Sequence, residues 1–372
     1  SPQRPEARAA MLAVLDAGGN ASSIHAEGRA ARKVVEAARG AVGTLAGVSP
    51  RCVTFVSGGT EAAATLLQPG LVGRGGVTGF RSLIVSAVEH SCVLAGGGFA
   101  TGNVHVCPVD DVGLIDLAAL DGLLRSVPGP VLVAVMAANN ETGVIQPLAD
   151  VSALVRRHGG ALVVDAVQAL GKIALDVSSA DALFVSAHKI GGPQGVGAIL
   201  RASEAVDFPR LIRGGGQEGR VRAGTENLSG IAGFGAAARV ASTDDMPRLA
   251  VLRDWLEGQI VTMSGQSRVV GLPAERLANT SLTVHPGLDS ATMLIALDLQ
   301  GVSVSAGSAC SSGKVSASHV LAAMGLPDKE ARSALRVSLG PDATQADIDQ
   351  FINVARRVLA RLGAAEGRSD AA

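Results

Sequence analysis

Short runs of apolar residues alternate with helix-like stretches from residue 50 to about residue 200. The runs are uninterrupted and rich in β-branched residues, which is typical of strands buried on both faces of a parallel sheet. Helix-like segments such as Asp116–Arg125 and Leu148–His158 separate several of them. The pattern predicts an α/β architecture with a mainly parallel mixed sheet and helices on both faces. The strand candidates are Val53–Val56, Leu83–Ala87, Val104–Cys107, Val131–Met136, Leu162–Val164, Ala182–Val185 and Val196–Leu200.

The pattern changes after about residue 245. A helical stretch at Met246–Met263 precedes shorter strand candidates at Thr280–Val284, Val302–Ser305 and Leu335–Ser338. An amphipathic helix at Thr344–Leu362 leads into a polar tail that we expect to fray. We therefore expect two domains. The large one spans residues 1–245, although its first residues could pack with the smaller one. The smaller α+β domain spans residues 246–372 and carries a cysteine loop.

Composition narrows the possible partners. The formal net charge is −1 and aromatic residues make up only 2% of the chain, so neither DNA, RNA nor an anionic membrane is an expected partner. The four cysteines are widely separated and form no CxxC pair, which argues against a disulfide framework and against a metal site. The first residues contain no apolar signal region. We expect a cytoplasmic protein without metal ligands.

Polar residues follow two successive strand candidates. Asp165 ends the run LVVD, and Lys189 follows ALFVSAH. Ligands of such sheets bind beyond the carboxyl ends of the strands. A carboxylate and an amine there are the pair that pyridoxal phosphate (PLP) requires, a Schiff-base lysine and an acid for the pyridinium nitrogen. Each residue alone also fits a structural role, as a surface lysine or as a helix cap.

Other strand candidates end in further polar groups. Gly59 and Thr60, in SGGT, begin a helix and could bind a phosphate through backbone N–H groups and a hydroxyl. His90 could stack on an aromatic ring or move protons. Asn140 offers an amide, and Arg336 interrupts an apolar strand with a guanidinium that suits a carboxylate. Each feature alone is also compatible with a structural role, but together they favour an active site.

The segment SAGSACSSGKVSAS surrounds Cys310 with Ser, Gly and Ala. A structural cysteine is usually packed among apolar side chains, whereas a reactive thiol requires exposure and space to move. The sequence therefore favours a reactive cysteine on a mobile loop.

These motifs, in this order, resemble the PLP-dependent cysteine desulfurases of the NifS/IscS type within the class V aminotransferase group. The match extends over nearly the whole chain, in the branch with a short cysteine segment. The residues that carry it are GNASSIH (19–25), SGGTEA (57–62), VEH (88–90), NNETGVIQP (139–147), VDAVQALGK (164–172), SAHKIGGPQGVG (186–197), RAGTEN (222–227), SAGSACSSG (305–313) and LRVSLG (335–340).

The resemblance implies a PLP-dependent transferase of fold type I and a role for each matching residue. Lys189 would bind PLP as a Schiff base, Asp165 would pair with the pyridinium nitrogen, and His90 would stack on the ring. Cys310 would receive sulfur. The remaining residues would bind the cofactor or the substrate: Gln168 the phenolic oxygen; Gly59, Thr60, Ser186 and His188 the phosphate, with Thr225 from the partner subunit; and Asn140 with Arg336 the substrate carboxylate.

The implied reaction converts L-cysteine to L-alanine and leaves the sulfur on Cys310 as a persulfide. The implied partners are a second copy of the chain, because the phosphate site is shared, and a sulfur acceptor such as an iron–sulfur scaffold. Related PLP activities, a selenocysteine lyase or a cysteine-sulfinate desulfinase, stay open.

Two departures from the family pattern also leave questions open. Relatives of this kind open with a Leu-Asp-Asn-Ala-Ala-Thr-Thr-Pro segment, and the sequence begins about where that segment would end. If the segment is absent, we expect weaker substrate binding, and a catalytically silent sulfur-transfer scaffold remains an alternative. Ala137 and Ala138 stand where many relatives carry a histidine.

Overall fold

The computed structural model describes residues 2–263, 265–307 and 318–369, and the side chains up to residue 362. The chain forms two compact units. The large unit comprises Ser1–Pro108, Asp116–Ala137 and Gln146–Thr243. The small unit comprises Val109–Ile115, Ala138–Ile145 and Asp244–Ala372, so two short segments within the first half of the sequence belong to it.

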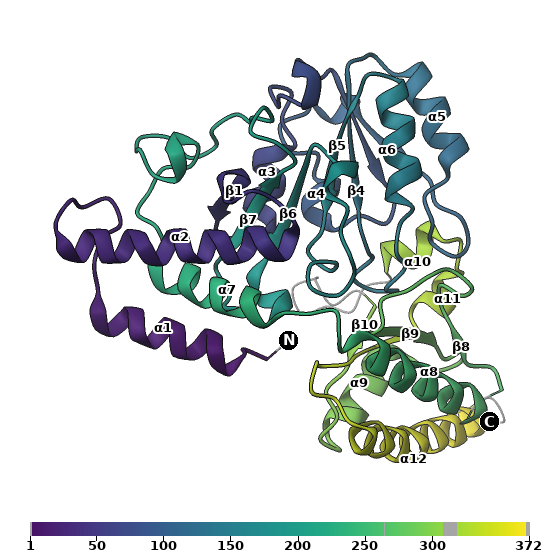
Figure 1. Cartoon of the computed structure of the whole chain (residues 1–372). Helices are drawn as coiled ribbons and strands as arrows, with labels where there is room; N and C mark the ends of the chain where they lie inside the picture. The colour runs from purple at the N-terminus through teal and green to yellow at the C-terminus, as the bar shows by residue number, and fades with distance from the viewer. Residues whose placement is uncertain (1, 264, 308–317, 370–372) are drawn as a thin grey trace. The chain divides into compact units, whose positions relative to one another are not determined.

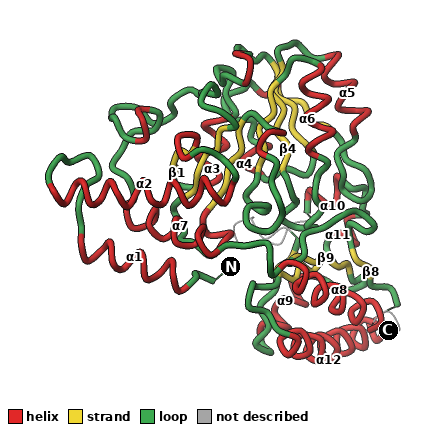
Figure 2. The backbone as a smooth tube through the Cα atoms, viewed as in Figure 1, coloured by secondary structure: helices red, strands yellow, loops and turns green. Residues whose placement is uncertain are grey.

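The large unit is built around a seven-stranded sheet with the order β1-β7-β6-β5-β4-β2-β3 (Figures 1 and 2). The five strands from β6 to β3 are parallel to one another, whereas β7 pairs antiparallel with both β6 and β1. This confirms the predicted mostly parallel sheet. The strands are β1 Val53–Val56, β2 Ser82–Ser86, β3 Val104–Cys107, β4 Val131–Met136, β5 Ala161–Asp165, β6 Ala182–Ser186 and β7 Gly197–Arg201.

Helices cover this sheet because alternate strand residues point to opposite faces and nearly all of them are apolar. One core cluster joins α3 and α4 to alternate residues of the strands, among them Leu83, Val85, Val163 and Phe184. Helices α1, α2 and α7 lie side by side. The helices are α1 Pro5–Ala17, α2 Ala26–Ala46, α3 Gly59–Leu66, α4 Ser91–Leu94, α5 Leu117–Ser126, α6 Leu148–Arg157 and α7 Leu228–Val240.

The small unit packs helices against a four-stranded antiparallel sheet with the order β10-β11-β9-β8. Its core joins α8, α9 and α12 to apolar residues of β11, including Leu335 and Val337. The strands are β8 Arg268–Val269, β9 Thr280–Val284, β10 Ser305–Ala306 and β11 Ala334–Ser338. The helices are α8 Met246–Met263, α9 Ser290–Asp298, α10 His319–Ala323, α11 Asp328–Ala331 and α12 Gln345–Ser369.

Two predictions for the small unit are wrong in extent. The predicted strand Val302–Ser305 is reduced to β10, because the Val302 N–H bonds the carbonyl of Leu297 at the end of α9 (3.0 Å) instead of a neighbouring strand. Helix α12 continues through Ser369, into the tail predicted to fray. The added residues include Ala, Glu and Arg, which are strong helix formers.

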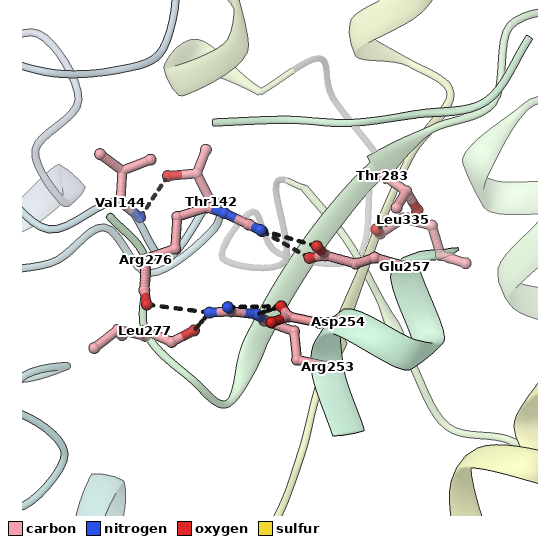
Figure 3. A network of polar contacts seen from close by, with 9 residues as sticks. All are labelled: Thr142, Val144, Arg253, Asp254, Glu257, Arg276, Leu277, Thr283 and Leu335. Carbon is pink, nitrogen blue, oxygen red and sulfur yellow. Dashed lines mark hydrogen bonds and ion pairs between the residues drawn. The ribbon is translucent and has the colours of Figure 1, made fainter. Parts of the chain in front are cut away.

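A buried ion pair fixes the segment around Gly143 to the rest of the small unit (Figure 3). Arg276 Nη1 and Nη2 donate to Glu257 Oε1 and Oε2 at 2.6 and 2.8 Å. The backbone next to Arg276 then pairs with the segment, since the Ile145 N–H donates to the carbonyl of Glu275 (2.9 Å) and the Leu277 N–H to that of Gly143 (2.8 Å).

Among the described residues, no helix combines the length and the apolar character needed to cross a membrane.

Candidate active site

Lys189 lies in a single 3₁₀ turn, Ala187–Ile190, between β6 and β7. The two strands pair antiparallel on either side of it, and the Ala187 N–H donates to the carbonyl of Val196 (3.1 Å). Gly191 ends the turn with φ +82°, a left-handed conformation that glycine adopts without strain. The half-buried Lys189 is therefore presented by a turn that begins at the end of β6 and is held by backbone hydrogen bonds.

Asp165 is the last residue of β5, next to β6 in the sheet, and its side chain is buried. Burial raises the pKa of its carboxyl to about 7, while a hydrogen bond from the Val167 N–H (2.8 Å) and the positive charge of Lys189 act in the opposite direction. The carboxyl and the amine are thus near enough to interact electrostatically, as expected for the ends of two neighbouring parallel strands.

A second buried carboxyl, that of Glu89, lies near Asp165 and was not identified from the sequence. Its Oε1 accepts a hydrogen bond from the Met136 N–H (2.7 Å), and Met136 is the register partner of Asp165 in the β4–β5 ladder. Burial, and then the charge of Asp165, raise the pKa of Glu89. The signal in the sequence was the acidic residue directly before the histidine in VEH. Asp165 therefore has a second buried acidic group near it.

His90 is half-buried and caps the short helix α4, where its Nδ1 accepts from the Cys92 N–H (3.2 Å). The same nitrogen lies 3.1 Å from Cys92 Sγ, and the Thr60 hydroxyl also hydrogen-bonds that thiol. Cys92 also packs against the core of the large unit. Burial raises its pKa to about 12, which keeps the thiol protonated. The Cys92 thiol thus contacts both His90 and Thr60, two of the predicted cofactor ligands.

The turn between β1 and α3 brings backbone close to the neighbouring strand. Gly58 is extended, and α3 begins at Gly59 with Thr60 exposed in its first turn. A Cβ on Gly197 would lie 2.9 Å from Gly58 Cα and 2.6 Å from the carbonyl oxygen of Val185, so β7 tolerates only glycine there. A Cβ on Gly59 would approach Val167 Cγ2 to 3.2 Å. Close packing therefore fixes the start of α3, where N–H groups can bind an anion.

Two further predicted phosphate ligands lie at the end of β6. Ser186 Oγ and His188 Nδ1 are 2.8 Å apart. Burial, followed by the charge of Lys189, lowers the pKa of His188. Gln168 is half-buried, and its Oε1 accepts a hydrogen bond from Lys172 Nζ (3.0 Å). These side chains share the large unit with Asp165 and Lys189.

Two ion pairs fix the segment that leads to Thr225. Glu218 forms two hydrogen bonds of 2.8 Å with Arg39 and accepts a third from the Phe55 N–H (2.8 Å). Arg222 pairs with Glu61 at 2.9 Å. Thr225 itself is exposed and lines a cavity of about 140 Å³ together with Ser57 and Glu226, among others.

Asn140 and Arg336 belong to the small unit and contact each other there. Arg336 Nη1, from β11, donates to the carbonyl oxygen of Asn140 (2.8 Å). The charge of Arg336 also acts on Glu141, whose pKa burial raises to about 7. The two predicted substrate ligands thus meet, and Glu141 joins them although the sequence analysis assigned it no role. Cys310 lies outside the described residues.

The residues of the large unit fit PLP chemically. The group needs an amine for its aldehyde, an acid for its ring nitrogen, and donors for its phosphate. Lys189 and Asp165 supply the first two from adjacent strand ends, and burial leaves the Asp165 carboxylate favouring a cationic partner. The glycine-lined start of α3 supplies backbone donors.

Comparisons with known proteins agree with this reading. The class-V aminotransferase family matches residues 6–351. The chain is 40% identical to a cysteine desulfurase of Cereibacter sphaeroides, covering 97% of this chain and 94% of that protein. It is 36% identical to an IscS-like cysteine desulfurase of Mycobacterium tuberculosis, with the same two shares. A NifS-like protein of Rickettsia africae superposes with a TM-score of 0.85 at 31% identity, covering 96% of both chains. The chain therefore belongs to the class-V aminotransferase family, whose members are PLP-dependent enzymes, and within it to the cysteine desulfurase group.

Proposed function

We propose that this protein is a PLP-dependent cysteine desulfurase that converts L-cysteine to L-alanine and transfers the sulfur to Cys310. The observation that carries the proposal is the pairing of Asp165 with Lys189 at the ends of adjacent parallel strands. Similarity over nearly the whole chain, at 40% and 38% identity, to proteins named cysteine desulfurase supports the choice of substrate.

The cofactor would be held by residues of the large unit. Lys189 would bind its aldehyde carbon, Asp165 its ring nitrogen and Gln168 its phenolic oxygen, and His90 would stack on the ring. The start of α3 at Gly59 and Thr60, with Ser186 and His188, would bind the phosphate. When bound, PLP withdraws electrons from the Cα of an amino acid attached to it.

The protein's own residues then move and hold protons. Once the substrate amino group has taken its place on the cofactor, the freed Lys189 amine would take the proton from the substrate Cα as general base. Asp165 is buried, so a protonated ring nitrogen beside its carboxylate would stabilise it, and the carboxylate would keep the proton on that nitrogen. Arg336 and Asn140 bind the substrate carboxylate, for which a guanidinium fork is well suited.

Sulfur transfer requires a nucleophile, and the sequence around Cys310 supports that residue. The Cys310 thiolate attacks the substrate Sγ and forms an S–S bond. The electron pair of the substrate Cβ–Sγ bond leaves with Cβ, which gains a proton as alanine forms. The protein is left with a persulfide on Cys310, which a thiol of an acceptor takes by exchange.

We further propose that the protein works in the cytoplasm as a homodimer, with Thr225 of each subunit completing the phosphate site of the other. The acceptor would be a protein, with an iron–sulfur scaffold as the first candidate. The net charge and composition of this chain support no direct role for nucleic acid or membrane.

The test compares Cys310→Ser with Lys189→Ala in the PLP-supplemented protein, by absorbance and by alanine and sulfide release. Cys310→Ser should keep the cofactor absorbance and lose desulfuration, whereas Lys189→Ala should lose both. Desulfuration at the wild-type rate by Cys310→Ser would refute the assignment of Cys310. Turnover of selenocysteine or cysteine sulfinate, but not of cysteine, would favour the related PLP activities. If the protein does not bind PLP, the proposal of a PLP-dependent enzyme is refuted, and the catalytically silent sulfur-transfer scaffold is the alternative that remains.

A further inference from the structure

Glu141 is a buried acidic residue next to the proposed substrate site, and neither the sequence analysis nor the proposed mechanism uses it. It lies in a turn that Asn139 holds together: Asn139 Oδ1 accepts from the N–H groups of Glu141 (2.8 Å) and Thr142 (2.9 Å). The residue is 4% exposed, which is rare for a glutamate and requires partners for its carboxyl.

Its first partner is Ser318. Ser318 Oγ donates to Glu141 Oε2 at 2.5 Å, and this serine is 1% exposed. The same hydroxyl accepts from the Leu321 N–H (3.2 Å), so it also caps α10. The Glu141 carboxyl thereby binds Ser318, the residue that follows segment 308–317 in the sequence.

Its second contact is Gly307, the residue before that segment. A Cβ on Gly307 would lie 3.1 Å from Glu141 Oε2 and 3.3 Å from Ser318 Cβ. Gly307 follows β10, which pairs with β11 so that Ser305 faces Arg336 in register. The carboxyl therefore lies where both flanks of the segment meet, and Cys310 belongs to that segment.

Its third contact is electrostatic. The charge of Arg336 acts on the Glu141 carboxyl, while the Arg336 Nη1 bonds the carbonyl oxygen of the preceding residue, Asn140 (2.8 Å). Arg336 is the charged group that acts on this carboxyl, and Ser318 is its hydrogen-bonding partner. One turn thus carries both a carbonyl that binds Arg336 and a carboxyl that binds Ser318.

We propose that Glu141 is a positioning residue that aligns the two flanks of the Cys310 segment with the Asn140–Arg336 substrate site. The inference rests on the proposed function, because alignment matters only if sulfur moves from a bound amino acid to Cys310. Misplacing a nucleophile slows its attack strongly even where the reacting groups are unchanged.

The experiment separates substrate binding from sulfur transfer in the PLP-loaded full-length protein. Binding is followed by the change in cofactor absorbance on mixing with L-cysteine. Transfer is followed by trapping thiols at timed intervals and measuring the persulfide on Cys310 by mass spectrometry. The variants are Glu141→Ala, Glu141→Gln, Ser318→Ala and the double variant Glu141→Ala/Ser318→Ala.

Glu141→Ala and Ser318→Ala should each slow persulfide formation at least about 10-fold, the scale of leaving one buried hydrogen-bonding group unsatisfied. The L-cysteine concentration for half-maximal absorbance change should stay within about 3-fold, because Asn140 and Arg336 are retained. Glu141→Gln should stay within about 3-fold of the wild-type transfer rate, since its amide oxygen can accept from Ser318. The double variant should be no slower than the slower single one.

Asp289→Ala is the matched control, since Asp289 caps another helix of the same unit, α9, where its Oδ1 accepts from the Thr292 N–H (3.0 Å). It should leave transfer unchanged. If Glu141→Ala does not fold, Ser318→Ala tests the same contact from its other side.

Several results would overturn the inference: wild-type transfer in Glu141→Ala or Ser318→Ala, equal slowing in Asp289→Ala, or equal slowing in Glu141→Gln. A wild-type protein that forms no persulfide from L-cysteine would instead overturn the proposed function, and the inference with it. The two failures are therefore distinguishable.

Discussion

Breaking the buried ion pair between Glu257 and Arg276 should destabilise the small unit far more than breaking an exposed pair of equal length. Both charges are almost inaccessible, with side-chain exposures of 8% for Glu257 and 3% for Arg276, and both guanidinium bonds are short. In Glu257→Leu, the Arg276 guanidinium would remain buried without its carboxylate (Figure 3).

The expected magnitude follows from the two bonds lost. Hydrogen bonds to charged groups contribute about 1.5–3 kcal/mol each, so two give about 3–6 kcal/mol. This agrees with the cost of about 3–5 kcal/mol for removing one partner of a buried pair. In the double variant Glu257→Leu/Arg276→Met, both charges are gone, and most of the loss should be recovered.

The protein offers a local probe for this measurement. Its one tryptophan, Trp255, lies in α8 two residues before Glu257. Urea unfolding followed by Trp255 fluorescence therefore reports on the unit that carries the pair. At a slope of about 2 kcal/mol per molar urea, Glu257→Leu should lower the midpoint by about 1.5–2.5 M.

The control is the exposed pair of Arg332 and Asp328, whose atoms are 2.8 Å apart but whose side chains are 54% and 67% exposed. Asp328→Ala should change the free energy of unfolding by less than about 1 kcal/mol. The reasoning is refuted if Glu257→Leu costs no more than this control, or if the double variant is as unstable as Glu257→Leu.

Two further predictions concern the large unit and the protonation of the small one. Gly197→Ala should weaken PLP binding at least about 10-fold, since overpacking costs about 1–3 kcal/mol and the added Cβ would press on Gly58 at the start of α3. Absorbance titration with PLP measures this, with Gly122→Ala, whose Cβ meets open space, as control; equal affinities would contradict it. His285 is buried between Ser267 and Thr283, and burial lowers its pKa to about 4. As the pH falls below 6.5, His285 binds a proton in the unfolded chain but not in the folded protein. The free energy of unfolding should therefore drop by about 2 kcal/mol from pH 6.5 to 5. An NMR titration that places the His285 imidazole near pKa 6.5 would show this to be wrong.

The strand ends could be predicted from the sequence because burial and chain direction leave a local signal. The apolar runs at Val104–Cys107, Val131–Met136 and Thr280–Val284 coincide with β3, β4 and β9. Asp165 and Lys189 could then be assigned to one edge, since parallel neighbours end on the same side.

Contacts between distant segments left no such signal. Ser318 and Glu141 are 177 positions apart, so nothing near either residue in the sequence indicates their hydrogen bond. The Val302–Ser305 run was apolar because Val302 and Val304 pack against the core of the small unit, not because they pair with a strand. Periodicity reports burial, and burial alone does not specify the partner.

The turn that carries Lys189 limits how this lysine can act. It follows directly from β6, and residues 191–196 separate it from β7. The Ala187 N–H bonds the carbonyl of Val196 (3.1 Å), and the Gly192 N–H bonds that of Ala187 (2.9 Å). Because these backbone hydrogen bonds hold the turn, the reach of the amine is set mainly by its own four methylene groups. Replacing Lys189 with a shorter cationic side chain leaves a gap that the backbone cannot close, so only a small diffusible amine could restore the missing base.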